Sequence, residues 1–262
     1  MRYIIVNFKR LVCQWQLYAS ILVIILSGII TLKRNFILHN LQSLTQIGAL
    51  NLFIYSNIVE NGYMSILAPI LPVFSTSSLI FDDIRNGFYR NLANIKNSLR
   101  YFLSGIVSSS LMGGSLYVVT YLIMMLFYII VDPRPSPFIE FRSGVFWEIY
   151  MESMLKYVFV FLINSFIFGT AYSFLGCGLM LIMKNKYTAI GIVMLLYLIP
   201  IYFINLLPNR LAIALQWIIP TLTFEISTYN LPIIMHITQL LTIIAISTII
   251  VWISYRKTRI II

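Results

Sequence analysis

Charged residues are scarce in this chain. Asp, Glu, Lys and Arg together make up 10% of the 262 residues, whereas hydrophobic residues make up 60% and the mean hydropathy is +0.91. A soluble domain has about 25% charged residues, and a soluble core of this size could not bury so much apolar surface. The composition therefore excludes an ordinary soluble domain and predicts an all-α polytopic membrane protein.

Cysteine is nearly absent as well. Cys13 and Cys177 are the only two, and both lie in apolar or interfacial segments, so we expect free thiols rather than a disulfide framework. Lys33 and Arg34 follow the first apolar run, where a removable signal peptide would have small residues at a cleavage site. We therefore expect no signal peptide.

The motifs of the common active sites are also missing. The sequence has no G-x-x-x-x-G-K-[ST] phosphate loop, no G-x-S-x-G and no H-E-x-x-H. His39 and His236 lie far apart, without cysteine or carboxylate at metal-ligand spacing. We expect this chain to have no enzymatic activity, no cofactor and no metal of its own.

Six apolar segments are long enough to cross a hydrocarbon core about 30 Å thick. Pro69 and Pro72 should kink the second of them. The expected spans, all in a single transmembrane domain over residues 1–262, are about 11–32, 63–80, 101–131, 157–183, 187–207 and 233–255. None of them has a carboxylate in its middle, whereas proton and sodium relays usually need one.

The distribution of Lys and Arg predicts the orientation. With both termini inside, twelve of the 18 basic residues fall in inner segments, and Asp82 and Asp83 are the only carboxylates there. This places the chain in the cell membrane with cytoplasmic termini. The net charge of +10 is then explained by topology and by attraction to anionic lipid, and a nucleic-acid partner is not needed.

Residues 208–232 are too apolar for an ordinary loop. Pro208, Pro220 and Pro232 divide them into pieces that are too short to span. We expect a re-entrant segment that dips into the outer leaflet between the fifth and sixth spans.

Residues 81–100 are the longest polar interruption. Their apolar side chains recur at helical spacing, and the charged side chains lie off this stripe, which predicts an amphipathic inner helix with Gly87 as its weak point. The stripe is Phe81, Ile84, Phe88, Leu92, Ile95 and Leu99. A helix that only floats in the interface is the alternative interpretation. The N-terminal segment around Phe8 and Trp15 repeats the pattern more weakly, and it is either an interfacial helix or ordinary basic flanking.

Small residues recur every fourth position in two of the spans. Gly105, Ser109 and Gly113 form one series, and Gly169, Ser173 and Cys177 form the other. Such spacing lets helix backbones approach closely. Packing within the chain is the expected use, and a subunit interface is the alternative.

This pattern resembles the permease subunits of type-2 ABC transporters. The family's motif in the first inner loop is an acidic residue, then glycine, then a Ser/Thr-Arg region that enters the third span. It is similar to Asp83, Gly87, Ser98, Arg100 and Tyr101 here, with Asp in place of the usual Glu. The resemblance implies that two permeases pair and that each binds a separate ATP-hydrolysing subunit, which holds the ATP and Mg²⁺. Residues 81–100 would then be the coupling helix.

On that resemblance, the partner-binding residues would include the charged side chains of the coupling segment, and two apolar side chains would grip the bundle. The expected site is Asp82, Asp83, Arg85, Gly87, Phe88, Arg90, Leu92 and Lys96. The implied function is export of a hydrophobic or amphipathic substrate, such as an antimicrobial peptide, a lipid or a drug. An ion-driven secondary transporter and a non-transporting structural subunit are the alternatives.

Overall fold

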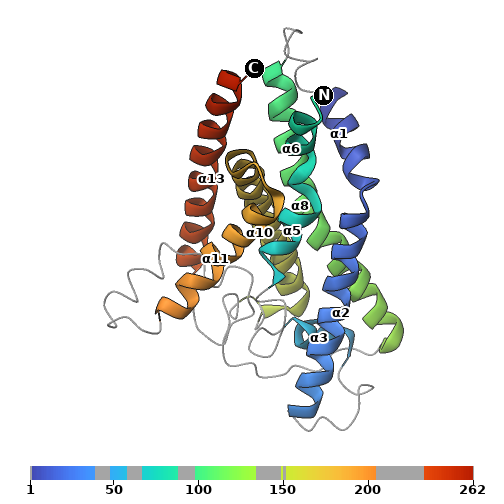
Figure 1. The fold of residues 1–262 in the computed structure, drawn as a ribbon. Coiled ribbons are helices and arrows are strands. Elements are labelled where there is room, and N and C mark those ends of the chain that lie inside the picture. The colour runs from blue at the N-terminus through green and yellow to red at the C-terminus, as the bar shows by residue number, and fades with distance from the viewer. Residues whose placement is uncertain are drawn as a thin grey trace.

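Every regular element in the described part of the chain is a helix. The structure is a computed structural model, and it describes residues 2–38, 48–57, 67–87, 98–133, 149, 152–204 and 233–261. The helices form an elongated bundle (Figure 1). They are α1 (Arg2–Val12), α2 (Trp15–Leu38), α3 (Ala49–Ser56), α5 (Ile70–Thr76), α6 (Ser78–Arg85), α8 (Ser98–Val131), α10 (Met154–Met183), α11 (Lys186–Ile204) and α13 (Ile233–Ile261).

Four of these helices are long and apolar enough to cross a membrane. The qualifying stretches are Trp15–Arg34 in α2, Arg100–Val131 in α8, Leu155–Met183 in α10 and Ile237–Arg256 in α13. Each falls on one of the expected spans. The all-helical class is therefore confirmed for the described residues. These four segments are consistent with a membrane protein, because about 20 apolar residues of helix match the thickness of a bilayer core.

The second expected span differs from the prediction, and the fifth extends beyond the residues that the structure describes. In the described part of the second expected span, from residue 67, the structure has two short helices, α5 and α6, joined at Ser77, and α6 continues to Arg85. The fifth expected span begins as predicted, since α11 starts at Lys186, but residues 205–207 lie outside the described residues. The count of six spans and the re-entrant segment 208–232 thus stay predictions.

Pro72 explains a contact between α5 and α8. Proline has no N–H, so the carbonyl of Ala68, four residues earlier, has no helical donor. The Tyr117 hydroxyl on α8 donates a hydrogen bond to that carbonyl, and both residues are fully buried. The carbonyl group that Pro72 leaves without a helical donor is therefore satisfied by a side chain from another helix.

The two series of small residues meet each other in the centre of the bundle. A Cβ added at Gly169 on α10 would fall closer than 3.0 Å to the carbonyl oxygen of Gly113 on α8, and a Cβ at Gly113 would clash with Ser173. The backbones of α8 and α10 thus approach closely at this point. For these residues, the structure favours packing within the chain over a subunit interface.

One end of the bundle holds α1, α6 and the end of α13, together with both termini (Figure 1). Phe102 near the start of α8 and Tyr255 near the end of α13 pack there with ring centroids 5.3 Å apart. We call this the charged end, because Lys9, Arg10, Arg85 and Arg100 are exposed on it. Both termini lie at this end, which agrees with the prediction that they are on the same side of the membrane. That this side is the cytoplasm stays a prediction.

Candidate functional site

Helix α6 ends where the sequence predicted a weak point. The N–H of Asn86 donates to the carbonyl of Asp82 at 2.9 Å, and the N–H of Gly87 donates to that of Ile84 at 3.2 Å. Gly87 has φ +73°, a left-handed conformation that glycine adopts readily after a helix. The expected helix over 81–100 is therefore interrupted here, and the next described helix, α8, begins at Ser98.

Asp83 connects α6 to two other helices. The Arg10 guanidinium on α1 donates two hydrogen bonds to its carboxylate, at 2.6 Å and 2.9 Å. The Tyr101 hydroxyl on α8 donates a third at 2.5 Å and itself accepts one from Arg10 at 3.1 Å. We call these three residues the Asp83 triad.

The electrostatics of the Asp83 triad favour a fixed geometry. The Asp83 side chain is only 6% exposed, whereas that of Arg10 is 41% exposed. A bidentate guanidinium–carboxylate pair is among the stronger and more directional contacts in proteins. The hydrogen bonds from Arg10 to Asp83, together with the charge of Asp83, raise the pKa of the Arg10 guanidinium above its usual value, although partial burial acts in the opposite direction.

Asp82 makes a second link from α6 to the bundle. The Lys186 ammonium, on the first residue of α11, lies 2.6 Å from one oxygen of Asp82 and donates to the other at 2.7 Å. The same ammonium lies 5.9 Å from the centre of the Phe81 ring. Both side chains of this ion pair are about one-third exposed, so its contribution is that of a surface pair, roughly 0–1 kcal/mol.

The apolar face of α6 packs on the bundle as the stripe predicted. Phe81 is buried and Ile84 is partly buried. Ile80 fits against Gly105 of α8 so closely that a Cβ at Gly105 would lie 2.7 Å from it. We expected Phe88 and Leu92 to make the apolar contact with the bundle, and they lie outside the described residues. In the described part, Ile80, Phe81 and Ile84 make such a contact.

The structure separates the expected site residues into four groups. Asp82 and Asp83 are engaged within the chain, and Arg85 is exposed at the tip of α6 with no ion-pair partner among the described residues. Gly87 forms the turn that follows. The remaining four, Phe88, Arg90, Leu92 and Lys96, lie outside the described residues.

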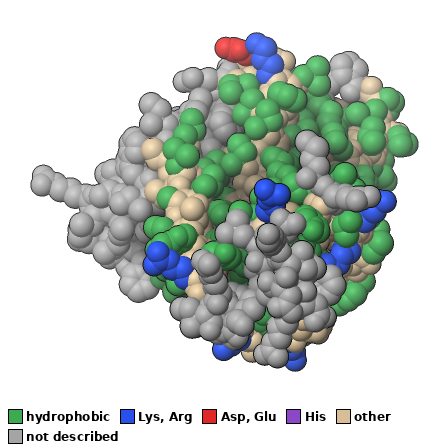
Figure 2. All heavy atoms as spheres, turned by 90° about the horizontal axis from the view of Figure 1, so that it is seen from above, with side chains coloured by type: hydrophobic (Ala, Val, Ile, Leu, Met, Phe, Trp, Pro, Cys, Tyr) green, Lys and Arg blue, Asp and Glu red, His purple; other side chains and the backbone are tan. Residues whose placement is uncertain are grey.

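Sequence reasoning missed Arg10, Tyr101 and Lys186 as partners of the α6 carboxylates. A buried carboxylate needs a cation or hydrogen-bond donors, but nothing in the local pattern says which distant residue supplies them. Figure 2, which looks onto the charged end, shows separate Lys and Arg side chains spread among apolar ones. The exposed charged side chains described near α6, which are those of Lys9, Arg10, Arg85 and Arg100, are all basic.

Within the described ranges, no group of three or more His, Cys, Asp and Glu side chains could hold a metal ion. In comparisons with known proteins, the chain matches no family model, no curated protein and no solved structure.

Proposed function

We propose that this chain is the permease subunit of an ATP-driven exporter of the type-2 ABC kind. It has no catalytic activity of its own, and it couples ATP hydrolysis by a separate cytoplasmic subunit to export of a hydrophobic or amphipathic substrate. One observation supports the coupling role above all. Helix α6 is fastened to α1 and α8 through Asp83 and to α11 through Asp82.

An element that receives a push must be attached stiffly to the elements that it moves. Pulling α6 away from the bundle would leave the buried Asp83 charge without Arg10, and an uncompensated buried charge is strongly unfavourable. The apolar contact of Ile80 with Gly105 adds resistance to sliding. A force on the tip of α6 would therefore pass to the end of α1 and to the starts of α8 and α11.

The energy source is proposed to lie outside the chain. The helices α2, α8, α10 and α13 contain no Asp or Glu, whereas an ion-driven transporter normally has carboxylates within its spans. This favours an ATP-hydrolysing partner over the ion-driven alternative. On this proposal, ATP and Mg²⁺ bind to the partner subunit, and a second permease completes the transport unit in the cell membrane.

Arg85 is the residue through which the partner contact can be tested, because it is exposed and lies at the tip of α6. The full chain is co-purified with its ATP-binding-cassette subunit, and the ATPase rate is measured with and without the permease. We expect Arg85→Glu to weaken association about tenfold or more, because a like-charge contact in a complementary interface costs several kcal/mol. Arg34→Glu is the matched control, since Arg34 is exposed near the far end of α2.

Two outcomes would overturn the proposal. One is that no nucleotide-hydrolysing subunit binds the chain, or that its ATPase rate is the same with and without the permease. The other is transport that continues without ATP and stops when ion gradients are collapsed, which would establish the ion-driven alternative. Binding of the ATPase without any transported substrate would instead identify a structural subunit.

A further inference from the structure

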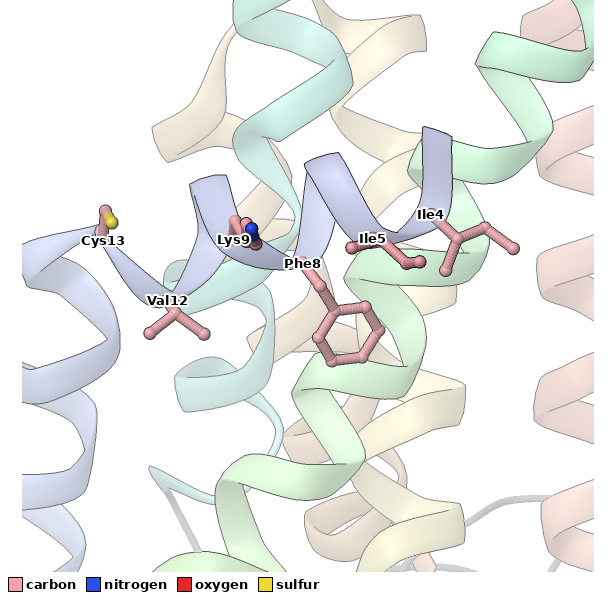
Figure 3. Close-up of a pocket in the computed structure, with 6 residues that line it drawn as sticks. All are labelled: Ile4, Ile5, Phe8, Lys9, Val12 and Cys13. Atoms are coloured by element: carbon pink, nitrogen blue, oxygen red, sulfur yellow. The ribbon is translucent and has the colours of Figure 1, made fainter. Parts of the chain in front are cut away.

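A hollow of about 500 Å³ runs along the outer side of α1. It is lined by Ile4, Ile5, Phe8, Lys9, Val12 and Cys13 (Figure 3). Phe8 and Val12 project from the same side of the helix, and Cys13 marks the junction with α2. The volume is within the range of sites for small molecules, about 300–1,000 Å³.

The hollow faces away from the bundle because the opposite face of α1 packs on α8. Asn7 donates to the Ser104 hydroxyl at 3.4 Å, and the Ser108 hydroxyl donates to the carbonyl of Ile4 at 3.3 Å. Leu11 on this inner face is fully buried, whereas Ile5 is 58% exposed and Val12 42% exposed. Phe8 is half-buried and packs against the core, so the hollow lies along the edge of the contact between α1 and the bundle, where Ile5 and Val12 face the surroundings of the chain.

Among the described residues that line the hollow, Lys9 is the one with a charged side chain. The surface of the hollow is almost entirely apolar, so the methylene chain of Lys9 lines it, and the side chain is exposed. The carboxylates on the described residues are engaged elsewhere: Asp82 with Lys186, Asp83 with Arg10, Asp132 with the Gly48 N–H, and Glu152 with Lys156. Within this part of the chain, no carboxylate is left to pair with Lys9. The charge suits an anion that comes from outside the chain.

The hollow is continuous with the surface that faces lipid. Directly after Cys13, the exposed side chains Trp15, Tyr18, Leu22 and Leu26 follow one another at helical spacing along α2, a candidate membrane-spanning helix. Tryptophan at the start of such a helix is typical of headgroup depth. An amphipathic helix with basic residues on its polar side lies at the same depth.

From these observations we propose that the hollow along α1 binds one bilayer phospholipid with an anionic headgroup. Its acyl chain lies against Ile5, Phe8 and Val12, and its phosphate pairs with Lys9. The lipid is a component of the membrane and not the exported substrate. The proposal rests on the membrane placement within the proposed function, and it does not depend on ATP coupling.

Such a lipid would act on the candidate site through the chain itself. Lys9 directly precedes Arg10, which holds Asp83. A lipid that fixes Lys9 at the membrane surface also restrains the helix that supplies the partner of α6. Anionic lipid would therefore stabilise the attachment of α6 to the bundle.

The test uses the full chain in nanodiscs that contain equal parts of phosphatidylcholine and phosphatidylglycerol, with retained lipid counted by native mass spectrometry. We expect the wild type and Lys9→Arg to retain phosphatidylglycerol preferentially. Lys9→Ala should lower that retention about fivefold, the effect of one basic residue at an anionic surface. Lys184→Asn is the matched control, because Lys184 is an exposed lysine outside the hollow with φ 54°, a conformation that Asn tolerates.

Cys13 gives an independent readout, since it lines the hollow and is exposed, whereas Cys177 is buried. Phosphatidylglycerol should slow maleimide modification of Cys13 in the wild type and in Lys184→Asn, but not in Lys9→Ala. Undiminished retention in Lys9→Ala would overturn the proposal, and so would an equal loss in Lys184→Asn, which would indicate surface charge alone. Disulfide-linked Cys13 dimers would show that a second copy covers the hollow. None of these measurements needs the ATPase, so they can fail or succeed separately from the proposed function.

Discussion

The Asp83 carboxylate on α6 lies 2.6 Å from the Arg10 guanidinium on α1, although the two residues are 73 positions apart in the sequence. The pair attaches the N-terminal helix to the segment between α5 and α8, and the Tyr101 hydroxyl completes it from a third helix. The buried acid and its donors thus determine how three helices meet at the charged end. This relationship is also the most direct one to test.

Arg10→Ala should destabilise the protein. It leaves a buried carboxylate with Tyr101 as its remaining partner in the triad, and a buried acceptor that loses a partner costs about 1–3 kcal/mol, more when it is charged. The measurement is the free energy of unfolding in detergent. Arg85→Ala is the control, since Arg85 is exposed on α6, and a surface change of this kind is usually within about 0.5 kcal/mol.

A double-mutant cycle separates the pair from general effects of each substitution. Asp83→Asn removes the charge that needs Arg10, so Arg10→Ala should be less harmful in that background. The expected coupling energy is about 0.5–3 kcal/mol, as for residues in one hydrogen-bond network. Strictly additive losses would show that the two side chains do not depend on each other.

From the sequence, the position of this site was more predictable than the contacts that its residues make. The apolar stripe through Phe81 and Ile84 correctly indicated which face of α6 packs on the bundle. The stripe also placed Asp83 on the polar face, and the family resemblance then included it among the partner contacts. In the structure its side chain is buried against Arg10 and Tyr101 of this chain. Periodicity describes one helix at a time, so it carries no information about a cation 73 positions away.

The same limit applies to the fold. The segments α2, α8, α10 and α13 were predictable because some 20 apolar residues leave the chain few alternatives to a spanning helix. The joint between α1 and α2 was not. We expected the first span to begin at Leu11, but Leu11 belongs to α1 and the break falls at Cys13 and Gln14, where no glycine or proline marks it.

Two tyrosines in the bundle interior should respond differently to loss of the hydroxyl group. Tyr117 donates to the carbonyl of Ala68 that Pro72 leaves without a helical donor, so Tyr117→Phe should cost about 1–3 kcal/mol. The Tyr172 hydroxyl is buried and has no hydrogen-bond partner among the described residues, so Tyr172→Phe should be neutral or stabilising. Thermal unfolding of both variants in the same detergent makes the comparison, and equal shifts would contradict the assigned hydrogen bond.

Gly87 should be replaceable by Asn but not by Ala. No atom lies within 4 Å of a Cβ added there, so the only obstacle is its φ of +73°. The left-handed conformation costs an ordinary residue roughly 1–2 kcal/mol, and Asn pays less because its side chain can bond locally. Unfolding free energies should rank Gly87→Ala below Gly87→Asn, and the reverse order would mean that this turn does not hold the backbone as described.

The close approach of α8 and α10 makes a sharp prediction for two glycines. A Cβ at Gly169 would press on the backbone carbonyl of Gly113, which cannot move aside as a flexible side chain can, whereas a Cβ at Gly191 in α11 would meet nothing within 4 Å. Gly169→Ala should therefore cost about 1–3 kcal/mol by forcing the helices apart. Gly191→Ala should be neutral or stabilising by up to about 1 kcal/mol, because alanine favours the helix. If both variants unfold at the same temperature in detergent, α8 and α10 do not meet backbone to backbone at Gly169.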